Sequence, residues 1–244
     1  MTALTVGDLR FELRRSARRT SVQITVDRGG ELLLLAPESC STEVMESFVR
    51  EKRFWIYTKL AVKDALGPTV PTKQFVSGEG FPYLGRSHRL QLVDAQDVPV
   101  KLERGRFKML RSAAEKGGAV AHMVRWYVER GQFWLEKRVE LFQRRVGVEP
   151  TRVTVQDLGY RWGSCGKGGR LFFHWRAVLL PPPVIEYVVV HELVHLIEPH
   201  HGAAFWRRVE RAMPDFSGRK QWLDEKGSVV AETLAPAARG RAAK

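Results

Sequence analysis

Three histidines and one glutamate stand close together in the last quarter of the sequence. His191 and His195 flank Glu192 in the run HELVH, and His201 follows six residues later. On a helix, residues four apart share a face, so the rings of His191 and His195 can point at one metal ion. Glu192 would then lie beside a water on that ion. Zinc held by neutral imidazoles lowers the pKa of such a water towards about 7, and a carboxylate can take its proton as it attacks a carbonyl.

The residues around this run predict a buried helix over residues 184–197. Three prolines, Pro181 to Pro183, precede it, and proline is tolerated in the first turn of a helix. Apolar residues then recur at helical intervals. Glu198 stands before Pro199, which disfavours the helical conformation and predicts the end of the helix.

A sharp turn after the helix would allow His201 to fold back as the third ligand. Three protein ligands and one open position are typical of a catalytic zinc, so the sequence predicts one Zn²⁺ per chain. His200 is the alternative third ligand. The histidine spacing equals that of the metzincin pattern HExxHxxGxxH, but Glu198 stands where that pattern has glycine. We therefore do not place the chain among the metzincins.

Several further segments resemble one family, the YgjP-like metallopeptidases, which are distant relatives of the SprT group. These segments are Arg161-Trp162-Gly163-Ser164-Cys165, Trp175-Arg176, Tyr187 to Leu193, His201 to Trp206, Arg14 to Arg19 and Tyr83-Leu84-Gly85-Arg86. The resemblance is densest from Arg161 to Trp222. It implies that His191, His195 and His201 are zinc ligands and that Glu192 is the catalytic base. His200 and His174 stand where the family commonly has Asn, and neither change removes a ligand.

Four other residues could act near this site. Tyr187 precedes His191 by one helical turn and could stabilise a developing oxyanion, although a buried Tyr more often only packs. By the resemblance, either the strand expected over residues 170–180 or the segment from Arg161 to Cys165 binds the substrate backbone by strand addition. Arg161 and Trp162 are therefore predicted to contact the substrate. Cys165 is a less favoured alternative, an inhibitory thiolate on the zinc.

The pattern of the whole chain predicts an α+β protein. Alternating residues from 9 to 36 indicate a small antiparallel meander, and residues 119–146 a long amphipathic helix that Gly131 weakens. In a helix expected over residues 43–66, the predicted core residues are Val44, Phe48, Phe54, Trp55 and Leu60. We expect an N-terminal antiparallel β-rich domain over residues 1–116, a minimal zincin (SprT-like) domain over residues 117–228, and a basic, disordered tail over residues 229–244.

Composition limits the surroundings and partners of the protein. The chain has 244 residues and a formal net charge of +13. Such a charge favours anionic partners, nucleic acid first and an anionic membrane surface second, although it could equally be a solubilising surface. Two cysteines and an N-terminus rich in arginine lead us to expect a cytoplasmic protein without a disulfide framework. The longest aliphatic run, Leu32 to Ala36, is too short to cross a membrane.

The leading functional hypothesis is a zinc-dependent metallopeptidase that hydrolyses peptide bonds with Glu192 as general base and acts near nucleic acid. Two alternatives remain open at this point. One is a zinc hydrolase of a non-peptide substrate, such as a nucleotide phosphoanhydride. The other is a nucleic-acid-binding protein with a weak zinc site, against which the intact Glu192 argues, because binding alone would not need that carboxylate.

Overall fold

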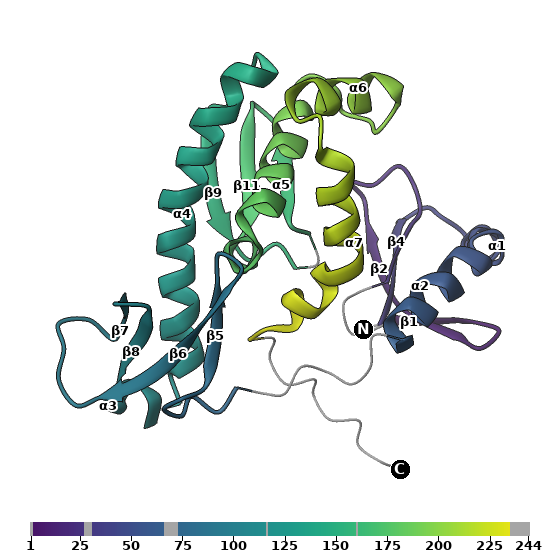
Figure 1. Ribbon diagram of the computed structural model, residues 1–244. Helices are drawn as coiled ribbons and strands as arrows, with labels where there is room; N and C mark the ends of the chain where they lie inside the picture. Colours follow the sequence, from purple (N-terminus) through teal and green to yellow (C-terminus); the bar gives the residue numbers. More distant parts are fainter. Residues whose placement is uncertain (1, 27–30, 66–72, 116, 160, 235–244) are drawn as a thin grey trace, which may run out of the picture. The chain divides into compact units, whose positions relative to one another are not determined.

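The computed structural model describes residues 2–26, 31–65, 73–115, 117–159 and 161–234, and only the backbone of residues 61–65 (Figure 1). The described residues divide into two compact units: an N-terminal unit that ends at residue 65 and a C-terminal unit that begins at residue 73. Within the described residues, the fold mixes three small sheets with seven α-helices. No helix in those ranges is both long and apolar enough to cross a membrane.

The N-terminal unit has one four-stranded sheet, in the order β1-β2-β4-β3. Its strands are β1 Thr2–Val6, β2 Leu9–Ser16, β3 Gln23–Val26 and β4 Leu32–Pro37. The expected antiparallel meander is wrong in one respect, because β2 and β4 run parallel. β3 pairs with the outer side of β4, which leaves the inner side of β4 free to pair with β2. The alternation of residues indicates strands but not their partners.

Two helices pack on this sheet, α1 Thr42–Glu51 and α2 Arg53–Ala65. They replace the single helix expected over residues 43–66, and Lys52 lies at the break. Three of the expected core residues are exposed instead: Val44, Phe54 and Trp55, with exposed fractions of 56%, 85% and 42%. The buried residues are Met45 and Val49, which lie four apart on one side of α1, and Ile56 of α2.

The C-terminal unit begins with a second four-stranded sheet, in the order β5-β6-β8-β7, whose middle strands are parallel. Its strands are β5 Gly80–Tyr83, β6 Arg86–Val93, β7 Val100–Glu103 and β8 Arg106–Leu110, and α3 Arg111–Glu115 and α4 Ala119–Val146 follow. Trp126 and Tyr127 of α4 pack their rings against Phe107 of β8. The chain therefore divides near residue 70, whereas we expected a joint at residue 117.

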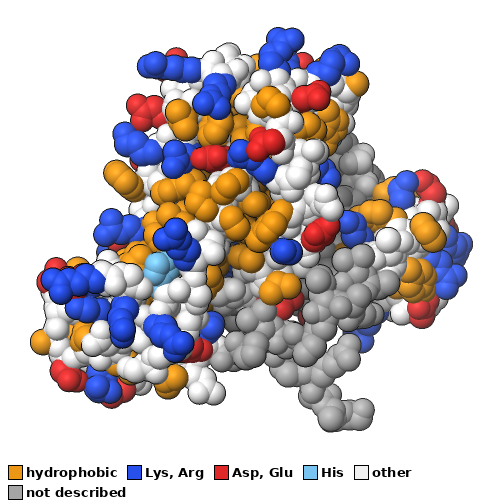
Figure 2. Space-filling view, viewed as in Figure 1, with side chains coloured by type: hydrophobic (Ala, Val, Ile, Leu, Met, Phe, Trp, Pro, Cys, Tyr) orange, Lys and Arg blue, Asp and Glu red, His pale blue; other side chains and the backbone are white. Residues whose placement is uncertain are grey.

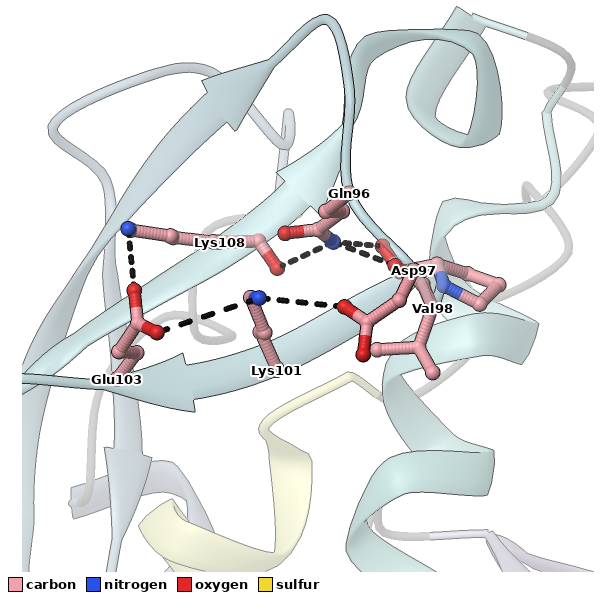
Figure 3. A network of polar contacts seen from close by, with 7 residues as sticks. Gln96, Asp97, Val98, Lys101, Glu103 and Lys108 are labelled. Atoms are coloured by element: carbon pink, nitrogen blue, oxygen red, sulfur yellow. Dashed lines mark hydrogen bonds and ion pairs between the residues drawn. The ribbon is translucent and has the colours of Figure 1, made fainter.

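Two lysines of the β7–β8 hairpin form ion pairs with nearby acidic side chains (Figure 3). Lys101 lies between Asp97 and Glu103, and Glu103 also contacts Lys108. The Gln96 side chain donates to three backbone carbonyls of the same hairpin, those of residues 98, 99 and 108. These two lysines therefore contribute little uncompensated positive charge.

A three-stranded sheet in the order β10-β11-β9 precedes the histidine run in the sequence. Its strands are β9 Arg152–Gln156, β10 Gly163–Gly166 and β11 Arg170–His174. The strand expected over residues 170–180 stops at His174, and the 3-10 helix η1 Trp175–Leu179 follows. The cause is local: the His174 Nδ1 accepts a hydrogen bond from the Arg176 backbone N–H at 2.9 Å and so caps η1.

Three helices complete the unit: α5 Pro182–Val194, α6 Ala203–Ala212 and α7 Phe216–Glu232. α5 packs against α4, α6 and α7 (Figure 1) and also against β10, and most of its side chains are buried. It ends at Val194, three residues before the expected end. α7 continues to Glu232, so residues 229–232 are helical rather than part of a disordered tail, and residues 235–244 lie outside the described residues.

Two glycines, Gly85 and Gly131, allow neighbouring elements of the C-terminal unit to pack closely together. The turn between β5 and β6 donates backbone N–H groups from Leu84 and Gly85 to η1 carbonyls, at 2.7 and 3.3 Å. Gly85 has φ +74°, and a Cβ there would lie 2.8 Å from the Pro181 Cα. Gly131 does not weaken α4; its missing side chain lets Val155 and Val178 pack against the helix.

Candidate metal centre

The three histidine rings meet at one point. The Nε2 atom of His195 lies 3.2 Å from that of His191 and 3.1 Å from that of His201, and the last two are 3.0 Å apart. His191 comes from the last turn of α5, His195 from its C-cap, and His201 from the segment before α6. The turn predicted from Glu198-Pro199 therefore brings the third imidazole back to the first two.

A backbone carbonyl fixes the tautomer of His195. The Nδ1 of His195 lies 3.0 Å from the Glu198 carbonyl oxygen, which can only accept a hydrogen bond. Nδ1 therefore carries the proton, and the lone pair of Nε2 points into the cluster. The Arg208 side chain of α6 donates to the Glu198 carboxylate at 3.1 Å and ties the turn to the next helix.

Burial favours the neutral form of two imidazoles in the cluster. Burial, followed by the nearby His195 and His201, lowers the pKa of His191 to about 3. Burial and the neighbouring histidines also lower the pKa of His201. Neutral imidazole is the form that binds a metal ion, because the coordinating nitrogen must carry a free lone pair.

Two aromatic residues of α6 form the wall of the cluster. The Phe205 ring is fully buried, and its centroid lies 4.6–4.9 Å from those of all three histidines. Trp206 stacks on His201 with ring centroids 5.9 Å apart. Phe205 and Trp206 therefore pack against the histidines, which explains how the exposed His201 keeps its orientation.

The cluster fits a metal ion. Tetrahedral bonds of about 2.0–2.1 Å to three nitrogens would place those nitrogens roughly 3.3–3.4 Å apart, close to the observed separations. The Nδ1 of His191 is buried with no hydrogen-bond partner among the described residues. Within the same ranges, the residues grouped so as to hold an ion are His191, His195 and His201, without Cys165 or His200. His174 lies apart, as the buried cap of η1.

Glu192 is buried beside the cluster, with 6% of its surface exposed. Burial raises the pKa of its carboxyl to about 8, although the Arg161 charge and a backbone hydrogen bond from Cys165 act in the opposite direction. The Glu192 side chain packs against the backbone of Gly163 in β10. The carboxylate therefore lies between the helix of the histidines and the outermost strand of the sheet.

The residues predicted to touch the substrate lie around Glu192. Tyr187 is buried, with its ring centroid 5.8 Å from that of His191, and burial followed by the charges of Asp224 and Glu192 raises its pKa. Arg161 is exposed and acts on Glu192 through its charge. Trp162 packs against α7, where a Cβ on Gly227 would lie 3.4 Å from the indole.

Comparison with known proteins identifies the family of the chain. A family model described as "YgjP-like, metallopeptidase domain" matches residues 20–226. The chain belongs to the YgjP-like metallopeptidase family. Among solved structures, the crystal structure of the metallopeptidase zymogen of Pyrococcus abyssi abylysin is similar at 22% identity, with a TM-score of 0.36, covering 41% of this chain and 99% of that one. No curated protein matches the chain.

Sequence reasoning missed three contributors to the site. The Glu198 carbonyl is a backbone group, so no residue type could reveal it. Lys220 on α7 adds a positive charge that contributes to the lowered pKa of His191, but α7 is distant in sequence. Gly163 was visible inside the run Arg161–Cys165, where a glycine in a short strand is a signal of close approach by another group.

Proposed function

We propose that this metallopeptidase is a zinc enzyme in which His191, His195 and His201 hold the metal ion and Glu192 is the general base. The observation that carries the proposal is the meeting of three imidazole nitrogens beside the buried side chain of Glu192. Imidazole ligands suit zinc well. When bound, zinc supplies a Lewis acid that polarises a carbonyl and lowers the pKa of a water towards neutrality.

The protein's own groups would orient the reaction. Hydrogen bonding to Glu198 keeps His195 in the tautomer that leaves Nε2 free. Glu192 would accept a proton from the attacking water and could later pass it to the leaving amine. Tyr187 would donate to the developing oxyanion, since no hydrogen bond of its hydroxyl is found among the described residues, and Arg161 would lie at the mouth of the site.

We propose that the substrate backbone binds along the outer edge of β10. β11 lies between β10 and β9, so both of its sides are already paired, which excludes the strand after Arg170 as the binding edge. The His174 N–H donates to the Trp162 carbonyl at 2.8 Å. Backbone N–H and C=O groups alternate in direction along a strand, so those of Gly163 and Cys165 point away from β11. The Cys165 N–H is taken by the Glu192 carboxylate, which leaves the Gly163 groups and the Cys165 carbonyl for a substrate. An extended peptide could add there as a further strand.

The test is cleavage of an unfolded protein such as casein by the zinc-loaded chain. Replacing Glu192 with Gln keeps the shape of the side chain but removes the base, so we expect kcat to fall by about 10²–10⁴-fold. Zinc content, measured by atomic emission, should stay at one ion per chain in both proteins. Equal activity of the Glu192→Gln variant would refute the role of Glu192.

The two alternative functions give different results in the same assay. Added single-stranded DNA should raise cleavage if the net charge of +13 brings the enzyme to nucleic acid. A zinc-loaded protein that leaves casein intact but hydrolyses a nucleoside triphosphate would be a phosphoanhydride hydrolase. One that binds DNA and cleaves neither substrate would be a binding protein. Membership in a metallopeptidase family favours the peptide substrate.

A further inference from the structure

Gly163 and Glu192 compete for the same space. A Cβ placed on Gly163 would lie 2.6 Å from the Glu192 Cγ, 2.7 Å from Oε1 and 2.8 Å from Cδ. Ordinary van der Waals contact begins at 3.4 Å, so a methyl group at position 163 would overlap the whole carboxyl end of the glutamate. All three of the nearest atoms therefore belong to Glu192.

The backbone conformation does not explain this glycine. Gly163 has no φ in the left-handed region, whereas Gly168 and Gly169 in the turn after β10 have φ of +71° and +73°. An alanine could adopt the conformation of residue 163 without strain. The glycine is needed because the neighbouring carboxylate occupies the place of its side chain.

Glu192 has little room to move aside. Most side chains of its helix α5 are buried, and the nearby Val190 and Leu193 have no exposed surface. α5 packs directly against β10, and the Cys165 N–H holds the carboxylate from the same strand. The backbone of β10 from Gly163 to Cys165 therefore forms the surface on which the carboxylate rests.

We propose that Gly163 is a positioning residue that fixes the Glu192 carboxylate against β10. The inference rests on the proposed function, in which the outer edge of β10 also holds the substrate backbone. One strand would then set the distance between the scissile carbonyl and the base. A displacement of most of an ångström at the carboxylate would be enough to reduce turnover by about 100-fold.

The first arm of the test measures steady-state peptide cleavage by the zinc-loaded full chain. We expect Gly163→Ala to lower kcat by about 100-fold while KM and zinc affinity stay the same. Gly218→Ala is the matched control, because Gly218 is exposed in α7 with no atom within 4 Å of the added Cβ. An unchanged kcat for Gly163→Ala, or a raised KM with normal kcat, would overturn the positioning role.

The second arm needs no activity. Thermal unfolding of the zinc-loaded chain is compared for Gly163→Ala in the wild-type background and in a Glu192→Ala background, where the competing side chain is absent. We expect the added methyl group to lower the Tm only when Glu192 is present. An equal loss in both backgrounds would overturn the proposal. If the wild-type chain cleaves no peptide, the proposed function fails, and this arm still decides whether Gly163 holds Glu192.

Discussion

His201, the third histidine of the cluster, lies in a loop directly after His200, which is outside the cluster. This pair allows a matched experiment. Replacing His201 with Ala removes one of three nitrogens, and we expect zinc affinity to fall by more than the roughly 10–100-fold that loss of a supporting partner costs. Replacing the exposed His200 with Ala should leave it unchanged. Competition with a chromophoric chelator measures the zinc affinity of both variants. A larger loss for His200→Ala than for His201→Ala would make His200 the ligand.

Cys165 lies near the base without joining the metal cluster. Burial, followed by the charge of Glu192, raises the pKa of its thiol. Only the thiolate reacts with iodoacetamide, so we expect the rate–pH curve of the metal-free protein to lie at higher pH than that of N-acetylcysteine. In Glu192→Gln the curve should move to lower pH but keep the effect of burial. Mass spectrometry of the peptide with Cys165 gives the rates, and coinciding curves in both proteins would exclude the charge effect.

Elements differ in how much the sequence reveals about them. The bounds of α4 and the meeting of the histidines follow from local pattern: helical periodicity, the HELVH spacing and the proline after Glu198. The parallel pairing of β2 with β4 does not, because alternation contains no information about partners. The strand predicted over residues 170–180 is too long, because the apolar run continues into η1. Only the capping hydrogen bond of His174 shows where the strand gives way to the 3-10 helix.

The sequence predicts which side chains are buried on α5 but not on α1 and α2. Along α5 nearly every position is apolar, and the helix is buried on all sides, as expected. On α1 and α2, apolar residues occupy more than one face, so Val44, Phe54 and Trp55 could not be separated from Met45 and the rest of the core by type alone. The contact of Gly163 with Glu192 joins residues 29 positions apart, and sequence could signal only that something approaches closely.

η1 and α7 are joined by one buried arginine. Arg176 donates to the Thr233 and Leu234 carbonyls at 3.1 and 3.3 Å, and only 6% of its surface is exposed. Replacing it with Leu would leave these carbonyls without that donor, so we expect the free energy of unfolding to fall by about 2–4 kcal/mol. Arg211, exposed on α6, is the control, and its change to Leu should have little effect. Urea unfolding measures the free energy of unfolding of both variants. Equal losses would contradict the role of Arg176 in joining η1 to α7.

The positive charge of the molecule is only partly available to a partner. Lys101 and Lys108 pair with acids of their own hairpin, and Arg138 and Arg219 both contact Glu186 of α5. On the face shown in Figure 2, Lys and Arg side chains gather over the ends of α4 and α6 and over the β5–β8 sheet, with a hydrophobic band between them. On this face, attraction of a nucleic acid would therefore depend on separate basic areas rather than on one continuous surface.

The metal cluster, its aromatic wall and the strand β10 all belong to the C-terminal unit, whose core contains none of the residues that form the core of the N-terminal unit. A chain beginning at Pro71 should therefore fold and bind zinc alone. Because zinc would bind only the folded state, a zinc concentration about 100 times the Kd should add about 2.7 kcal/mol to the free energy of unfolding. The gain should be equal in the full chain and absent in His201→Ala. Thermal unfolding with and without EDTA measures it, and a shortened chain that is unfolded even with zinc would show that the site requires the N-terminal unit.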